Sequence, residues 1–247
     1  MGTRKKLSYV QKSCIGKAGK LMHSAGMLWP GARLGIAFSG GVDSWALLQI
    51  LRIYRKRLPF PIELMALHIN PGFAPENHLP LAAWLQENGI PAHLECLDIG
   101  PRAHTSENRT NSPCFWCSLK RRQRLFQLCQ TYNLTHLAFG HTSDDLVQTF
   151  FMNMTTNGRI EGMYPKESFF KGSLEVIRPL LWIDKFQIQR AAKAWNLPIV
   201  DNPCPSAHNS RRSDVEHWLE NLWAGDKRIR KNIVSALRRW QQFGPHD

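Results

Sequence analysis

The stretch Leu34–Ser44, LGIAFSGGVDS, organises the predicted fold. It opens with an apolar run that is short enough for a buried parallel strand. A turn with two glycines follows, and Trp45–Arg55 then carries apolar side chains at helical spacing on one face. A strand, a glycine turn and a helix N-terminus together predict an anion site, because backbone N–H groups and the helix dipole favour negative charge there.

The residue types in the turn refine this prediction. Ser39 and Ser44 add hydroxyl donors, and Gly40 and Gly41 let the backbone approach a phosphate closely. Asp43 would repel a phosphate, so it indicates either a Mg²⁺ ion held against the phosphates or contact with the reacting group. The turn lacks the lysine and the spacing of the GxxxxGK[ST] loop. The alternative is an ordinary glycine-rich turn between a strand and a helix.

Strand and helix patterns alternate along the rest of the chain, which predicts an α/β fold with a doubly wound parallel sheet. Ligands of such sheets lie at the carboxyl ends of the strands, so residues 39–44 and the pair Gly140-His141 are expected around one crevice. We expect further strands at Ile62–Ile69, Ala92–Leu97, Thr135–Phe139 and Glu175–Ile177, and helices at Glu76–Asn88, Ser118–Tyr132, Asp144–Met154 and Asp184–Trp195.

The chain is expected to have three parts. Residues 1–30 form a basic N-terminal helical segment, and residues 31–212 form a nucleotide-binding domain that includes the cysteine site described below. Residues 213–247 form a basic, helical C-terminal extension.

Composition narrows the function class. The 247 residues are 43% hydrophobic and 10% aromatic, which is enough for a sizeable core and excludes a disordered chain. The formal net charge of +13 indicates a polyanionic partner, and RNA or DNA fits better than a membrane, because no basic amphipathic segment or lipidation signal is present. The alternative is a generally basic, solvated surface. No apolar run reaches transmembrane length and no signal-peptide core is found, so we expect a cytoplasmic protein.

Three of the six cysteines form a candidate metal or redox site. Cys114 and Cys117 make a CxxC directly before a predicted helix, where a thiolate is stabilised. Cys204 follows far downstream in the proline-bounded NPCP segment. The three can hold three corners of an iron–sulfur cluster, or bind zinc together with His208, and the CxxC alone can act as a thiol–disulfide pair.

The remaining cysteines and a basic run receive structural interpretations. Cys96 and Cys129 are expected to be buried hydrophobic residues, and Cys14 is given no role. The basic run Lys120–Arg124 follows the CxxC. It is either a solvated helix face or a ridge that contacts phosphates beside the site.

Taken together, these motifs resemble the TtcA family, the tRNA 2-thiocytidine synthetases of the PP-loop ATP pyrophosphatase superfamily. The resemblance covers roughly Leu28 to Trp240. It rests on an ordered series of segments: SGGVDS, PGFAPENHLP, CFWCSLKRR, FGHTSDDLVQTFFMNM, GRIEGMYP, VIRPL, NPC and DKR.

The resemblance implies two sets of site residues. ATP and Mg²⁺ are expected at Ser39, Gly40, Gly41, Val42, Asp43 and Ser44, with Gly140, His141, Asp144 and Asp145 of a GHxxDD segment near the nucleotide. Cys114, Cys117 and Cys204 match the three protein ligands of a 4Fe-4S cluster whose fourth iron is open to the incoming sulfide. Asp43 and the three cysteines are the expected catalytic residues.

The resemblance also implies a reaction. The 2-oxo group of a cytidine in the tRNA anticodon loop is adenylated, and sulfur from sulfide or a persulfide carrier then displaces AMP. The family further suggests a homodimer. The alternatives are a lysidine-type ligase, a cluster-dependent desulfidase, or an RNA-binding protein with structural zinc.

Three positions depart from the family pattern. Val42 replaces the usual lysine of SGGKDS, Ala207 replaces a fourth cysteine, and Ser143 replaces an arginine in GHxxDD. These departures bear on which base is modified more than on the type of reaction.

Overall fold

The computed structural model describes residues 6–109, 111–200, 203–206 and 210–243. Over these residues, one six-stranded sheet has the order β3-β2-β1-β4-β6-β5, and β5 alone runs antiparallel to its neighbour. The predicted α/β, doubly wound sheet is therefore confirmed. The strands are β1 (Arg33–Ala37), β2 (Glu63–Asn70), β3 (Ala92–Cys96), β4 (His136–Ala138), β5 (Lys166–Phe169) and β6 (Leu174–Ile177).

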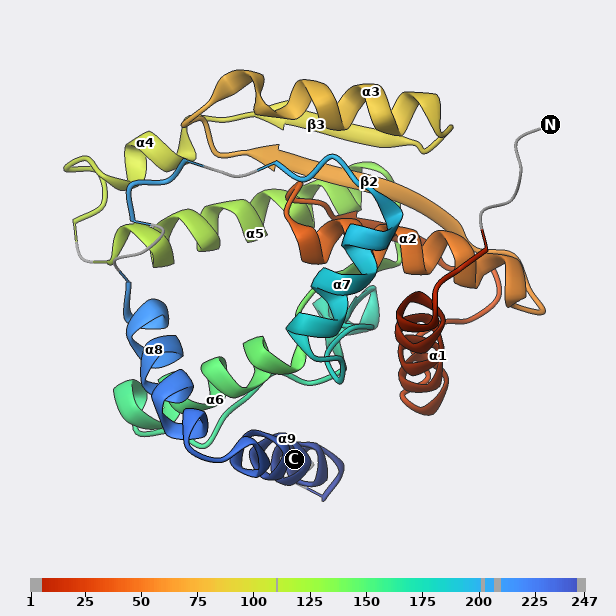
Figure 1. Cartoon of the computed structure of the whole chain (residues 1–247). Helices are drawn as coiled ribbons and strands as arrows, with labels where there is room; N and C mark the ends of the chain where they lie inside the picture. Colours follow the sequence, from red (N-terminus) through yellow and green to blue (C-terminus); the bar gives the residue numbers. More distant parts are fainter. Residues whose placement is uncertain (1–5, 110, 201–202, 207–209, 244–247) are drawn as a thin grey trace.

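The helices cover both faces of this sheet. They are α1 (Tyr9–Ser24), α2 (Val42–Tyr54), α3 (Leu79–Glu87), α4 (Ile99–Ala103), α5 (Pro113–Thr131), α6 (Ser143–Asn157), α7 (Lys185–Trp195), α8 (Arg211–Ala224) and α9 (Lys227–Phe243). Short 3-10 turns occur at Arg55–Arg57, Pro75–His78 and Phe170–Gly172. In Figure 1, α8 and α9 lie beside α6, far from the α3 and β3 edge.

The side chains on the two faces of the sheet pack into two separate hydrophobic clusters. Along β2, Leu64 and Ala66 pack into the cluster that includes buried residues of α1, α2, α3 and α7. Leu67 and Ile69 pack into the other cluster, against α5. This alternation is what a strand buried on both faces requires, because successive side chains point to opposite sides.

The strand order creates a crevice at the predicted place. The chain leaves β1 towards β2 on one side, while β4 lies on the other side of β1 and leads towards β6. Such a reversal leaves a gap beyond the carboxyl ends of the two central strands, where ligands of open α/β sheets bind.

Several predicted elements differ from the structure. The helix expected at Glu76–Asn88 begins as a 3-10 turn, and α3 starts only at Leu79 with a proline in its first turn. The short helix α4, between β3 and the CxxC, was not among the expected helices. The antiparallel strand β5 was not predicted, because its four residues mix polar and apolar types at a sheet edge.

Two cysteines were predicted to be buried, and the structure confirms one prediction and contradicts the other. Cys129 is buried on the inward face of α5. Cys96 is exposed, because it ends β3 at the open edge of the sheet. Among the described residues, no helix combines the length and apolarity needed to cross a bilayer.

We expect Leu48→Ala to lower the free energy of unfolding by about 2–5 kcal/mol, because the truncated side chain leaves a cavity in a packed core. Leu48 is fully buried in α2 beneath the sheet. Urea denaturation measures the change. The matched control is Leu79→Ala, at a position that is 54% exposed, where the change is expected within about 0.5 kcal/mol. Equal losses at both positions would contradict the assigned core.

Candidate functional site

The glycine turn between β1 and α2 is shaped by its own serines. Ser44 Oγ donates to the carbonyl of Gly41 at 2.8 Å and accepts from the N–H of Gly40 at 3.1 Å. Ser39 Oγ accepts from the N–H of Gly41 at 3.3 Å. The residue before α2, Gly41, offers no capping side chain, so the first N–H groups of the helix remain available to a ligand.

Glycine is required at two positions around the turn. Gly40 has φ +85°, and a Cβ atom there would lie 2.9 Å from a methyl group of Leu81. A Cβ atom on Gly140 would lie 3.0 Å from the backbone carbon and oxygen of Asp43. The chain after β4 therefore packs directly on the first turn of α2, which brings His141 to the same crevice.

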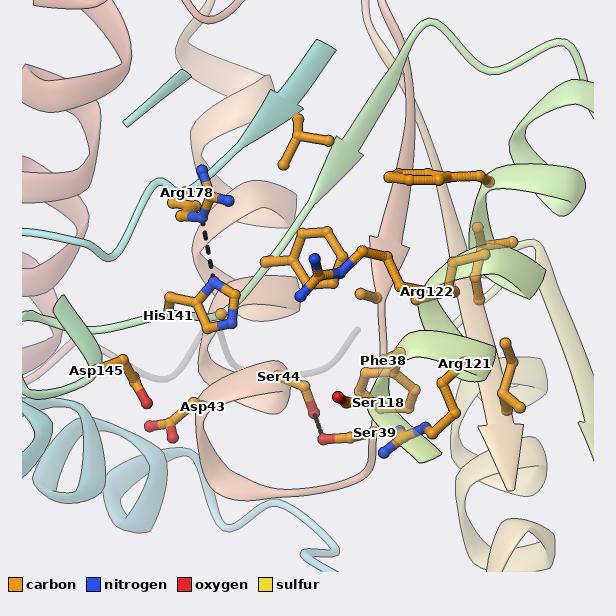
Figure 2. A pocket seen from close by; sticks show the side chains of 18 of the residues that line it. Phe38, Ser39, Asp43, Ser44, Ser118, Arg121, Arg122, His141, Asp145 and Arg178 are labelled. Carbon is orange, nitrogen blue, oxygen red and sulfur yellow. Dashed lines mark hydrogen bonds between the residues drawn. The ribbon is translucent and has the colours of Figure 1, made fainter. Parts of the chain in front are cut away.

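A cavity of about 460 Å³ opens beside this turn, within the size range of nucleotide sites. Figure 2 shows its polar side chains converging from β1, α2, α5 and the segment after β4. The predicted site residues that line it are Ser39, Asp43, Ser44, Gly140, His141 and Asp145. Gly40, Gly41, Val42 and Asp144 are not part of its wall.

Asp43 carries an unmatched charge at this cavity. Its Oδ1 atom is buried and has no hydrogen-bond partner. Burial, and next the carboxylate of Asp145, raise the pKa of Asp43 to about 6. Figure 2 shows these two carboxylates side by side. An orphaned carboxylate oxygen beside a phosphate-binding turn fits a Mg²⁺ ion. Since no group of three His, Cys, Asp or Glu residues in the described chain is arranged to hold a metal, phosphates and water would have to complete its shell.

His141 is held as a neutral hydrogen-bond donor. Its Nδ1 atom accepts from Nε of Arg178 at 3.3 Å, and its ring stacks on Phe139 with centroids 5.3 Å apart. Burial, which outweighs the nearby Asp145, lowers the pKa of His141 to about 4. The neutral ring therefore carries its hydrogen on Nε2, where it can be donated to a ligand oxygen.

The two aspartates of the GHxxDD segment differ in their contacts. Asp145 accepts from the N–H and the hydroxyl of Thr142 at the start of α6, and it pairs with Arg212 of α8. Asp144 accepts from Arg230 of α9 at 2.5 Å and from the N–H of Lys185 at 2.9 Å. Asp145 thus caps a helix at the cavity wall, whereas Asp144 links three helices outside it.

The cysteines lie within α5 rather than before it. Pro113 is the first residue of the helix and Ser112 caps it, so Cys114 and Cys117 occupy the first two turns. Burial raises the pKa of both thiols, with Cys204 as a further cause for each. In the metal-free chain, burial therefore shifts the pKa of both thiols in the direction opposite to the one expected from a helix N-terminus.

Cys204 is brought to the CxxC by the loop that contains it. The thiol of Cys114 donates to the carbonyl of Ser206 at 3.8 Å. The pKa of each CxxC thiol responds to Cys204, which places the three sulfurs near one another. Cysteine thiolates are the usual protein ligands of iron–sulfur clusters, so the three thiols are chemically suited to hold one. In the described part of the chain, however, the three thiols are not arranged closely enough to form a metal site. His208 and Ala207 lie outside the described residues.

The cysteine loop is tethered to the glycine turn. Trp45 of α2 donates from its indole Nε1 to the carbonyl of Pro198 at 2.9 Å. The N–H of Val200 donates to the carbonyl of Gly40 at 3.1 Å. The segment that leads to Cys204 therefore starts against the turn, which puts the anion site and the thiols within one region of the fold.

Four arginines line the cavity, and the sequence indicated a candidate phosphate-contacting role only for the two that belong to the basic run after the CxxC. Arg178 and Arg212 come from distant segments without a local signal. Two members of the basic run after the CxxC also line the wall, whereas Arg124 of that run pairs with Glu95 at 2.6 Å. The four are Arg121, Arg122, Arg178 and Arg212.

Comparisons with known proteins find sequences that are similar to this chain over most of its length. A family model described as a PP-loop domain matches residues 13–220. The tRNA-cytidine(32) 2-sulfurtransferase of Herminiimonas arsenicoxydans is 32% identical over 239 residues, which cover 96% of this chain and 69% of that protein. The one of Bordetella petrii is 33% identical over 217 residues, which cover 86% of this chain and 66% of that protein. The chain thus spans about two thirds of the length of these relatives.

Solved structures show the same fold. The U34-tRNA thiolase NcsA from Methanococcus maripaludis, solved with its [4Fe-4S] cluster, superposes with a TM-score of 0.78 at 22% identity. The match covers 96% of this chain and 80% of that one. The NH3-dependent NAD synthetase of Campylobacter jejuni superposes with a TM-score of 0.52 at 14% identity.

We expect Asp43→Asn to raise the free energy of unfolding of the metal-free protein at pH 8 by about 2 kcal/mol. The raised pKa means that the folded chain binds the Asp43 proton more tightly than the unfolded chain. Stability therefore falls as the pH rises from 3.8 through about 6 and stays low above that range. Urea denaturation in EDTA at pH 8 and at pH 4 measures the difference, which should vanish at the lower pH. An equal gain at both values would show that the ionised carboxylate carries no penalty.

Proposed function

Because the chain belongs to the PP-loop domain family and, within it, to the family of the tRNA-cytidine(32) 2-sulfurtransferases, we propose that it is an ATP-dependent tRNA thiolase that makes 2-thiocytidine. The observation that carries the proposal is the tether between the glycine turn and the cysteine loop, Val200 N–H to Gly40 O at 3.1 Å. It supports one site in which a nucleotide reaction and a sulfur reaction meet.

The glycine turn serves the activation half of the reaction. The free N–H groups at the start of α2 bind the departing pyrophosphate, and Asp43 holds Mg²⁺ against it. His141 donates from Nε2 to a phosphate oxygen. The 2-oxo group of the cytidine is adenylated in this arrangement, which converts a poor leaving group into AMP. The turn has no lysine, so these donors and the nearby arginines supply the stabilisation of phosphate charge.

The three thiols serve the sulfur half. Cys114, Cys117 and Cys204 would hold a 4Fe-4S cluster, which when bound offers an open iron for a sulfide. Cluster binding requires deprotonated thiols, and the raised pKa values of Cys114 and Cys117 make metal loading pH-dependent. The sulfur donor is assigned to the class of sulfide or a persulfide carrier. We place the reaction in the cytoplasm, on tRNA.

We expect a substitution at the cysteines and one in the glycine turn to affect adenylation and sulfur transfer differently. Cys204→Ala should reduce 2-thiocytidine formation by about a hundredfold or more, while pyrophosphate release that depends on ATP and tRNA continues. Asp43→Asn should abolish both, because the nucleotide is then bound without its metal ligand. Nucleoside mass spectrometry of tRNA and a pyrophosphate assay measure the two steps.

The matched control is Cys96→Ser, which changes an exposed cysteine at the sheet edge. Thiolation should stay within about twofold of wild type. If Cys204→Ala thiolates as well as this control, the thiolase assignment fails and a lysidine-type ligase is favoured. Iron and acid-labile sulfide analysis of anaerobically purified protein separates the cluster from a structural zinc.

We expect tRNA affinity to fall at least about tenfold between 50 and 200 mM salt, because each lysine or arginine contact to phosphate releases counterions. The formal net charge of +13 motivates this expectation. Filter binding or fluorescence anisotropy with unmodified tRNA measures the slope. A flat response would mean that the basic surface does not contact the substrate.

A further inference from the structure

Arg121 of α5 is a partly buried cation that forms no ion pair with a carboxylate of the described chain. Its Nε atom is buried and has no hydrogen-bond partner. Of the other three arginines at the cavity wall, two are paired, and Arg122 is exposed to solvent. Arg178 pairs with Glu167, and Arg212 pairs with Asp145. An unpaired buried guanidinium costs stability, so its presence points to an anionic ligand.

The surroundings of Arg121 place it between the two halves of the site. It follows Cys117 by one helical turn, and burial lowers the pKa of Arg121, an effect that negative charge on Cys117 opposes. On its other side it lines the cavity with Ser39 and Ser118. Figure 2 shows its guanidinium directed towards Ser39 at the glycine turn.

A further neighbour of Arg121, His68, is electrically neutral. His68 of β2 lies close enough for Arg121 to lower its pKa, which burial, as the main cause, brings to about 4. The ring donates from Nδ1 to the carbonyl of Phe38 at 2.7 Å, as a neutral imidazole does. No carboxylate of the described chain pairs with Arg121, which leaves its guanidinium available to an anionic ligand.

The choice of anion rests on the proposed function. Pyrophosphate leaves after the first step and sulfur arrives only for the second, whereas the α-phosphate takes part in both. A cation between the glycine turn and Cys117 therefore matches the α-phosphate. We propose that Arg121 binds the α-phosphate of the adenylated base and stabilises AMP as it leaves.

The two steps balance without a redox change. In the first, the base oxygen bonds to the α-phosphorus, and the bond from that phosphorus to the bridging oxygen of pyrophosphate breaks. In the second, hydrosulfide bonds to C2 of the base, the C2–O bond breaks, and AMP leaves with the electron pair. The hydrosulfide proton passes to solvent. Arg121 keeps its proton throughout and compensates the charge that develops on the phosphate.

The test is AMP binding to the full-length protein by isothermal titration calorimetry. Arg121→Gln should weaken AMP binding by about tenfold to hundredfold, since a charge-assisted hydrogen bond to phosphate is lost. Pyrophosphate affinity should change less than about twofold, because the first turn of α2 is intact. Arg121→Lys should fall between wild type and Arg121→Gln. The matched control, Arg124→Gln, removes the same charge from the same helix outside the cavity and should leave AMP affinity unchanged.

Two further measurements separate a ligand-binding role from a structural one. The midpoint of thermal unfolding of Arg121→Gln should equal or exceed that of wild type, because an unpaired buried charge is removed. With tRNA, ATP and sulfide, the pyrophosphate formed per 2-thiocytidine should rise in the variant. Unchanged AMP affinity, or marked loss of stability in Arg121→Gln, would overturn the proposal. Failure of the wild-type chain to thiolate tRNA, with AMP binding still weakened by Arg121→Gln, would instead overturn the proposed reaction and leave the phosphate contact.

Discussion

The site depends on the way a tight glycine turn presents the start of α2. The hydroxyl of Ser44 bonds to both glycines of the turn, and Gly41 has no side chain to cap the helix, so the first N–H groups of α2 have no side-chain partner. Glycine at position 140 then allows the chain after β4 to pack on that first turn. The same close approach fixes His141, and the carbonyl of Gly40 anchors the segment that leads to Cys204.

Two partly buried charged side chains line this cavity, and each has one buried atom without a hydrogen-bond partner in the described chain. Asp43 has an orphaned oxygen, and Arg121 has an orphaned nitrogen and no ion pair. Each costs stability in the free protein, and each is complementary to one part of a metal-bound nucleotide. The paired charges, such as Asp144 with Arg230, instead hold helices together around the site.

The parts of the fold that depend on local pattern were predicted well. The apolar runs of β1, β2 and β4 and the helical spacing of α2 and α7 are visible over short windows, because burial on a strand or helix face repeats at a fixed period. Boundaries were less accurate where proline decides them. The start of α5 at Pro113 changes the setting of the CxxC from a preceding loop to the first helical turns.

The sequence by itself determined the strand–turn–helix unit, the alternation that makes a doubly wound sheet, and the residue types of the anion and thiol sites. These features follow from backbone preferences and short spacings, which act within a few residues. Only the tertiary structure decided which charged side chains form ion pairs and which have no partner. It brought the loop of Cys204 to Cys114 through Ser206, kept Asp144 out of the cavity wall, and left Arg121 Nε without a partner. Such outcomes depend on desolvation and on contacts between segments 80 or more residues apart, such as Cys114 with Ser206 and Asp144 with Arg230, and no local pattern encodes them.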